Sequence, residues 1–225
     1  YFFSFFLICF LLSTIPFVYK IQKRVNPHKD LTELYAPELS YLNSVDKLIA
    51  YTDSLYKTRN IAGLDTGVYV SIVSETIKER FHFGLQLYDV SENWIACLGG
   101  ELLWSHLGAM VDPDDILKHS EGLCSQQTIV FMECLKRKKI NFRSVGLGYK
   151  EGPGHFLCEV HYNNSWRLHD VTKEPKWGKI VRHHESMDYY LSNKDSLYLV
   201  YESKIPKKDF DKLTEKVEYG KVNEF

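Results

Sequence analysis

The chain has 225 residues, of which 44% are hydrophobic and 25% charged, and its formal net charge is −1. That length suits one globular domain with extensions, because domains commonly run to roughly 100–200 residues. The balanced charge provides no basic field, which argues against a nucleic-acid partner. The 5 cysteines show no CxxC motif and no paired spacing, so we expect neither a zinc site nor a disulfide framework. The sequence leaves open one bridge among Cys97, Cys134 and Cys158.

Residues 1–19 (YFFSFFLICFLLSTIPFVY) contain no charged side chain. A run of about 18 apolar residues is typical of a membrane-spanning helix. A cleaved signal peptide or a buried core helix are the alternatives, but a signal core is usually shorter and no A-x-A-like site follows. We therefore expect a single-pass membrane anchor with the domain outside the cytoplasm. Lys20, Lys23 and Arg24 by themselves oppose that orientation, and the flank that competes with them is not in the sequence.

After this segment we expect a linker (residues 20–39), a domain (40–205) and a peripheral tail (206–225). Apolar residues in the domain recur at helical spacing in several stretches. The predicted helices are Ser40–Asn60, 66–83, one or two short helices in 93–107, and Ser125–Lys139. Asp112 followed by Pro113 is a typical start of a further short helix.

Short alternating stretches in the second half predict an antiparallel sheet. The predicted strands are Phe142–Tyr149, His155–Tyr162, Ser165–Val171 and Ser196–Ser203. Asn163-Asn164 suits a two-residue type I′ hairpin loop. Residues 175–195 are expected to be irregular, and the tail to form a short peripheral helix with a frayed end.

The segment Glu121–Thr128 (EGLCSQQT) places Cys124 where a loop becomes a helix. The amide groups and the positive dipole end of a helix N-terminus favour a thiolate over a thiol. Cys124 is therefore the candidate nucleophile of the chain.

The predicted hairpin selects a histidine for this cysteine. If Tyr162 pairs with Ser165, Leu157 lies opposite Asp170. Side chains alternate between faces along a strand, so His155 shares the face of Leu157 and Asp170. His155 and Asp170 are then diagonal neighbours, about 7–8 Å apart at the backbone, within reach of a hydrogen bond between their side chains.

The same register removes the competing residues. His169 and Cys158 fall on the opposite face of the hairpin. His161 shares the face of His155 but lies opposite Trp166, farther from the aspartate. A slip of one residue would reverse these assignments.

Cysteine, histidine and aspartate in this arrangement predict thiol chemistry on an acyl group. Cys124 would attack as thiolate, His155 would act as general base and then acid, and Asp170 would hold the imidazole tautomer. The Cys124 backbone N–H is the expected first donor of an oxyanion hole, with the Trp104 indole N–H as a candidate second donor. Weaker candidates for that donor are Gln126 and Gln127.

Each of these residues alone has a more ordinary interpretation. A single cysteine in a helix is usually a small buried apolar residue, and an aspartate after a strand is often a turn former. A non-catalytic binding module on a membrane tether is therefore the main alternative. A zinc enzyme is a further alternative without HExxH-like support; its candidate ligands are His155, His161, His169, His183 and His184.

Residues 121–175 resemble the core of the transglutaminase-like superfamily, within the papain-like group of thiol enzymes. The matching motifs are Gly122-Leu123-Cys124 at a helix start, Ile140-Asn141-Phe142-Arg143-Ser144-Val145, Gly154-His155-Phe156-Leu157-Cys158-Glu159-Val160, and Trp166-Arg167-Leu168-His169-Asp170. The family's Cys, His and Asp fall on Cys124, His155 and Asp170. Phe156-Leu157 after the histidine and Val171 after the aspartate depart from the common pattern without removing a catalytic group.

The resemblance implies an α+β fold in which N-terminal helices and a central helix carrying the cysteine pack on a small antiparallel sheet. It implies hydrolysis of an amide bond or acyl transfer from it through a thioester, with a protein or peptide substrate and no metal or organic cofactor. The family also includes members that have lost the triad and only bind.

Overall fold

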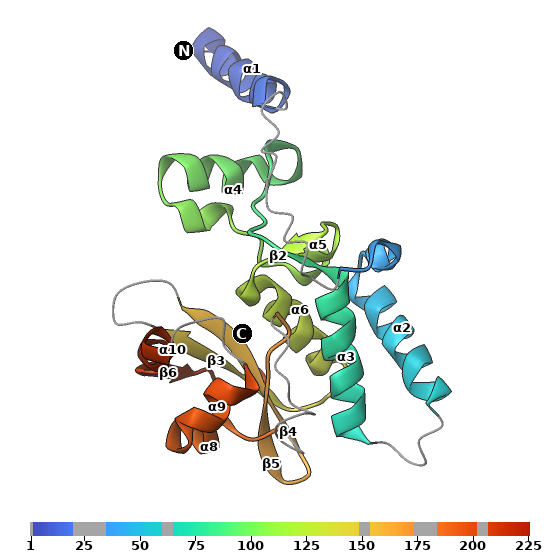
Figure 1. Cartoon of the computed structure of the whole chain (residues 1–225). Helices are drawn as coiled ribbons and strands as arrows, with labels where there is room; N and C mark the ends of the chain where they lie inside the picture. Colours follow the sequence, from blue (N-terminus) through green and yellow to red (C-terminus); the bar gives the residue numbers. More distant parts are fainter. Residues whose placement is uncertain (1, 20–34, 60–64, 149–153, 173–183, 202–206) are drawn as a thin grey trace.

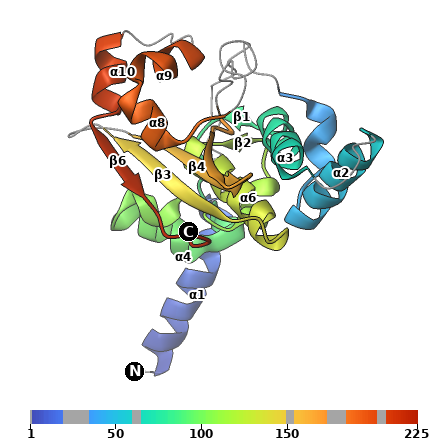
Figure 2. The same ribbon diagram turned by 90° about the horizontal axis from the view of Figure 1, so that it is seen from below.

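The computed structural model describes residues 2–19, 35–59, 65–148, 154–172, 184–201 and 207–225. The protein is a mixed α+β fold built around a four-stranded sheet in the order β5-β4-β3-β6, in which all neighbouring strands are antiparallel. Helices α2, α3 and α6 lie on one side of the sheet, and α8, α9 and α10 lie on the other (Figures 1 and 2). The predicted α+β class, with the cysteine-bearing helix packed on a small antiparallel sheet, agrees with this architecture.

The N-terminal half is helical, as the apolar spacing predicts. Its elements are α1 (Phe2–Tyr19), η1 (Pro37–Tyr41), α2 (Val45–Thr58), α3 (Thr66–Arg80), β1 (His82–Phe83), α4 (Val90–Leu102), η2 (Ser105–Gly108), α5 (Pro113–Leu117), β2 (Glu121–Gly122) and α6 (Cys124–Arg137). Side-chain caps fix several starts: Ser44 accepts from the Lys47 N–H, and the predicted cap Asp112 accepts from the N–H groups of Asp114 and Asp115. Such caps satisfy amide groups that have no partner within the helix.

The apolar segment predicted to be a membrane anchor forms α1, which contacts α4 (Figure 1). Within the described part of the chain, no helix combines the length and the apolar character needed to cross a membrane. The membrane location of the chain stays a prediction. Most of the predicted linker, residues 20–34, lies outside the described residues.

The predicted hairpin forms with the predicted register. Strand β4 (His155–Tyr162) pairs with β5 (Ser165–His169), and Tyr162 lies opposite Ser165. Asn163 and Asn164 have φ angles of 51° and 56°, in the left-handed region that a type I′ turn requires. Strand β3 (Phe142–Gly148) pairs with the other edge of β4.

The predictions for the C-terminal region need correction. The expected strand Ser196–Ser203 is wrong, because Lys194–Val200 forms helix α9 and residues 202–206 lie outside the described residues. Within 175–195, expected to be irregular, the described part contains helix α8 (Met187–Ser192). The tail forms helix α10 (Lys207–Leu213) and then an unpredicted strand, β6 (Lys216–Tyr219), which pairs with β3.

Packing explains why the run around Leu197 is helical. Leu197 and Val200 are both 0% exposed and pack into a cluster on one face of the sheet. The short apolar run fits the periodicity of a strand or of a helix. Burial of one side of a helix against the sheet decides between the two. The members of this second cluster are Val145, Leu147, Leu157, Leu168, Met187, Tyr190, Leu197 and Val200.

The opposite face of the sheet carries the main core. Cys158 and Val160 of β4 point into it and meet Phe131 of α6, and all three are 0% exposed. Because side chains alternate, Leu157 points into the second cluster instead. Strand β4 is therefore buried on both faces, and this burial fixes the position of His155 at its start.

The Asn-Asn turn provides a test of the hairpin. Replacing Asn164 by Ala is expected to lower the free energy of unfolding by about 1 kcal/mol, since Asn tolerates positive φ through local hydrogen bonds of its side chain and Ala cannot make them. Asn164→Gly is expected to leave the stability nearly unchanged, because Gly adopts positive φ without a steric penalty. Urea unfolding of both variants measures the difference; equal stabilities for Ala and Gly would contradict the left-handed turn.

Candidate functional site

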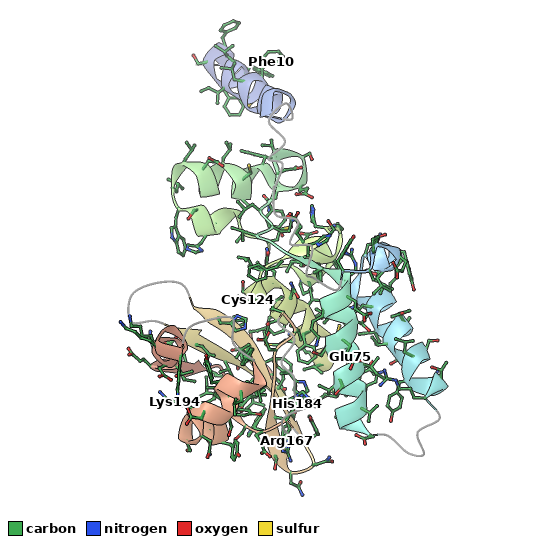
Figure 3. The ribbon with its side chains drawn as sticks, in the orientation of Figure 1. Phe10, Glu75, Cys124, Arg167, His184 and Lys194 are labelled. Atoms are coloured by element: carbon green, nitrogen blue, oxygen red, sulfur yellow. The ribbon has the colours of Figure 1, made fainter. Side chains whose placement is uncertain are left out.

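Cys124 is the first residue of α6 and lies at the end of this helix that faces α4 (Figure 3). The preceding Gly122 fits closely against the helix: a Cβ there would lie 3.2 Å from Cγ of Gln127. The Gln127 side chain in turn donates to the Gly122 carbonyl over 2.8 Å. The turn before the cysteine is thus locked to the first turn of α6.

Gln126 ties the same helix start to two other segments of the chain. Its Oε1 accepts from the N–H groups of Leu123 (3.1 Å) and Gln86 (3.0 Å). Its Nε2 donates to the carbonyls of Gln86 (2.7 Å) and Met110 (3.1 Å). Gln126 is 2% exposed, and its side-chain amide is bound to the main chain. It therefore holds two segments beside Cys124, the segment that leads into α4 and the segment that follows η2.

His155 reaches the site from the sheet. It is the first residue of β4, and the next residue, Phe156, is fixed to α6 by the Thr128 hydroxyl, which donates to the Phe156 carbonyl over 3.1 Å. The backbone N–H groups of Phe156 and Ser125 act on the Cys124 thiol and lower its pKa. The Thr128 hydrogen bond therefore joins the start of β4 to the first turns of α6, where the cysteine lies.

Asp170 follows β5 directly and is 2% exposed. Its Oδ2 lies 2.7 Å from Nε2 of His155, and its Oδ1 accepts from the Thr172 N–H over 2.9 Å. The Tyr201 hydroxyl also donates to Oδ2, over 2.8 Å. The diagonal neighbours expected from the hairpin register are in hydrogen-bond contact.

The side chains of Cys124 and His155 interact, and each shifts the pKa of the other. Since Nε2 of the imidazole faces Asp170, Nδ1 is the ring nitrogen left for the sulfur. The structure thus brings the predicted Cys124, His155 and Asp170 together, with a hydrogen bond between His155 and Asp170, while their catalytic roles stay a prediction.

This arrangement shifts two pKa values in the directions that a reactive thiol needs. Burial alone would raise the pKa of Cys124, but the hydrogen bond and charge of His155, with the N–H groups of Phe156 and Ser125, bring it below its ordinary value. Burial would lower the pKa of His155, but the charge and hydrogen bond of Asp170 and the contact with Cys124 raise it to about 9. Both shifts favour a thiolate–imidazolium pair at neutral pH.

The competing histidines lie elsewhere. The His161 ring packs against Trp166 with centroids 5.2 Å apart. His169 is 1% exposed and stacks on His184 at 4.3 Å, on the side of the sheet that faces Phe131. Among the described residues, no group of three or more His, Cys, Asp or Glu side chains is arranged to hold a metal ion. His183 lies outside the described residues.

Trp104 follows α4 and is 61% exposed. Its described ring contact is with His106, at a centroid distance of 5.0 Å. A role for its indole N–H as an oxyanion donor stays a prediction.

The 5 cysteines are all free thiols, so no bridge joins Cys97, Cys134 and Cys158. Burial raises the pKa of both Cys134 and Cys158, in contrast to Cys124. Both are 0% exposed, which makes them inert internal references for the reactivity of Cys124.

Tyr201 is the site residue that sequence reasoning missed. It caps the C-terminal end of α9, in a run whose pattern suggested a strand. Its contact with Asp170 joins residues 31 positions apart, and no local motif marks it.

Neither the models of known protein families nor the curated proteins give a match to this chain. Among solved structures, the chain is similar to one described as a crystal structure of a TGase, with 14% sequence identity and a TM-score of 0.41. The similarity covers 82% of this chain and 42% of that structure. The chain therefore spans less than half the length of that protein.

Alkylation by iodoacetamide tests the lowered pKa of Cys124. We expect Cys124 to react at pH 6–7 far faster than a free thiol of pKa about 8.5, and Cys134 and Cys158 to react only after denaturation. His155→Ala removes the group that offsets the effect of burial on the thiol. The Cys124 pKa should therefore rise, and the alkylation rate at pH 7 should fall. Peptide mapping by mass spectrometry identifies the modified thiol; a free-thiol profile for Cys124 would contradict the assembled pair.

The raised pKa of His155 predicts a pH dependence of stability. Its pKa is about 9 in the folded protein and about 6.5 in the unfolded chain. The interactions of the imidazolium with Asp170 and Cys124 therefore stabilise the fold fully below pH 6.5, on the order of 3 kcal/mol, and this stabilisation is lost as the pH rises through 9. Comparing urea unfolding of Cys124→Ala with that of Cys124→Ala/His155→Gln from pH 6 to pH 10 removes thiol titration and isolates the part of this stabilisation that comes from Asp170. A difference that does not change with pH would contradict the shift.

Proposed function

We propose that this protein is a transglutaminase-like thiol enzyme that acts on an amide bond. The observation that carries the proposal is the grouping of Cys124, His155 and Asp170, in which His155 Nε2 lies 2.7 Å from Asp170 Oδ2 and the imidazole lowers the pKa of the Cys124 thiol. The motif resemblance of residues 121–175 supports the same chemistry. The contrast with the inert Cys134 and Cys158 supports a role for Cys124 beyond packing.

The reaction begins with attack of the Cys124 thiolate on the carbonyl carbon of the amide. A tetrahedral intermediate forms, its oxyanion facing the N-terminus of α6, where the Cys124 N–H is the expected donor. The imidazolium of His155 then gives its proton to the departing nitrogen as the C–N bond breaks. The products of this half-reaction are a thioester on Cys124 and a free amine.

The second half-reaction removes the acyl group. His155, now neutral, takes a proton from a water molecule or an amine as that nucleophile attacks the thioester carbon. Water gives hydrolysis, and an amine gives acyl transfer to a new amide. The C–S bond breaks and the thiolate–imidazolium pair is restored. Asp170 holds the imidazole so that Nδ1 faces the sulfur in both halves.

The substrate class follows from this chemistry and from the resemblance. A protein or peptide that presents an amide to the half-buried start of α6 fits both. The chemistry needs no metal or organic cofactor. A membrane attachment through residues 1–19 would place the enzyme beside membrane-associated proteins; it is proposed on the composition of that segment.

Trapping of the thioester tests the proposal. A reactive acyl donor such as a p-nitrophenyl ester is expected to leave its acyl group on Cys124, seen as a mass increase on the peptide that contains this residue. Cys124→Ala should form no adduct and lower turnover by roughly 10⁴-fold or more, since the nucleophile is gone. Adding a primary amine to the trapped enzyme separates transfer from hydrolysis by the product formed.

The control for this experiment is Cys158→Ala, which removes a buried thiol from the same half of the chain. It should retain the adduct on Cys124. A folded protein whose Cys124 alkylates readily yet forms no acyl-enzyme with any amide or ester would instead favour the non-catalytic binding module.

A further inference from the structure

We propose that Tyr201 is a positioning residue of this site, which orients Asp170 and divides its charge between two donors, so that the end of helix α9 contributes a fourth residue to the group of Cys124, His155 and Asp170. The inference rests on the proposed function, since it concerns the same Cys124–His155–Asp170 chain.

Two side chains contact the same oxygen of Asp170. Its Oδ2 lies 2.7 Å from Nε2 of His155 and accepts a hydrogen bond from the Tyr201 hydroxyl over 2.8 Å. Oδ1 is held by the Thr172 N–H at 2.9 Å. The Asp170 side chain is 0% exposed, so these protein groups replace the solvation that water would give to a carboxylate.

Tyr201 arrives from the layer of helices opposite α6. Helix α9 is held on the sheet by Leu197 and Val200, both 0% exposed, and the Tyr201 ring packs against the same cluster. Asp170 shares a face with Leu168 by strand parity, and Leu168 belongs to that cluster too. The hydroxyl therefore approaches the carboxylate from the side on which Asp170 points.

The neighbouring helix is anchored on the sheet by a buried charge. Glu159 of β4 is 0% exposed, accepts from the Met187 N–H over 2.6 Å through Oε1, and binds Arg143 through Oε2 over 2.7 Å. This fixes the start of α8, which leads directly into α9. The position of the Tyr201 hydroxyl is thus set by the sheet that carries His155, and not by a free surface helix.

The hydrogen bond from the Tyr201 hydroxyl reduces the negative charge that the Asp170 carboxylate presents to the His155 imidazolium. Among the residues that the structure describes, the titratable groups around this point include His155 on β4, Cys124 on α6, Tyr190 on α8, Tyr201 itself and Asp170 after β5. Removing the hydroxyl leaves more charge on Oδ2 toward His155, and the imidazolium becomes harder to deprotonate. The enzyme would then lose part of the neutral His155 that it needs as base in the second half-reaction.

Tyr201→Phe tests this assignment, because it removes the hydroxyl and retains the ring. The measurement is an NMR titration of the imidazole ¹⁵N signals in the full chain, with the His155 signal identified by its loss in His155→Gln. We expect the His155 pKa to rise by at least half a pH unit above that of the unchanged protein. In the acyl-enzyme assay we expect deacylation to slow at least threefold at pH 7, with acylation less affected.

The matched control is Tyr219→Phe. Tyr219 also donates its hydroxyl to an aspartate, Asp188, over 2.5 Å, but on strand β6 and away from Asp170. It is expected to leave the His155 titration unchanged. Should Tyr201→Phe give no folded protein, Tyr201→Met, which also lacks the hydroxyl, is expected to give the same upward shift.

An unchanged His155 titration in a folded Tyr201 variant, with only a lower unfolding midpoint, would overturn the inference and leave Tyr201 a packing residue. A His155 titration in the Tyr201 variant that equals the one in Tyr219→Phe would also overturn the inference. The titration needs no turnover, so the shift can be measured even if no substrate is found. Failure of the acyl-enzyme assay with Cys124→Ala as reference would count against the proposed function alone.

Discussion

The arrangement of this protein depends on the buried carboxylate of Asp170. A charge removed from water must be solvated by the protein, and here an imidazole, a backbone amide and a phenol supply the donors. They come from the start of β4, the loop after β5 and the end of α9. A change in the position of any of these elements would leave the carboxylate with fewer donors, so the requirement links the site to the sheet and to the helices on its second face.

The sheet acts as the common frame of the two helical layers. Strand β4 buries Cys158 and Val160 against α6 and Leu157 against α8 and α9, which places His155 at a strand end between the layers. Helix α6 brings Cys124 to this end from one side, and α9 brings Tyr201 from the other. Gln126 adds a third constraint, because its amide fastens the segments around Gln86 and Met110 beside the cysteine. The geometry that shifts the pKa of Cys124 downward is therefore distributed over most of the domain.

Local sequence predicted the elements whose signals are short-range. The caps at Asp112 and the Asn163-Asn164 turn follow from the conformational preferences of single residues, and the turn then fixed the register that placed His155 beside Asp170. The C-terminal region could not be predicted in the same way. The run around Leu197 fits a strand or a helix, and only burial against Leu157 and Leu168 made it α9. Strand β6 depends on pairing with β3, which lies far from it in the chain.

The sequence by itself determined the cysteine at a helix start, the hairpin register and the histidine and aspartate that the register joins, because each follows from contacts between residues close in the chain. The tertiary structure decided the rest: that the five cysteines stay apart as free thiols, that Gln126 holds main chain, and that Tyr201 completes the environment of Asp170. These outcomes depend on how separate elements pack across a common sheet, which brings together groups that are far apart in the chain.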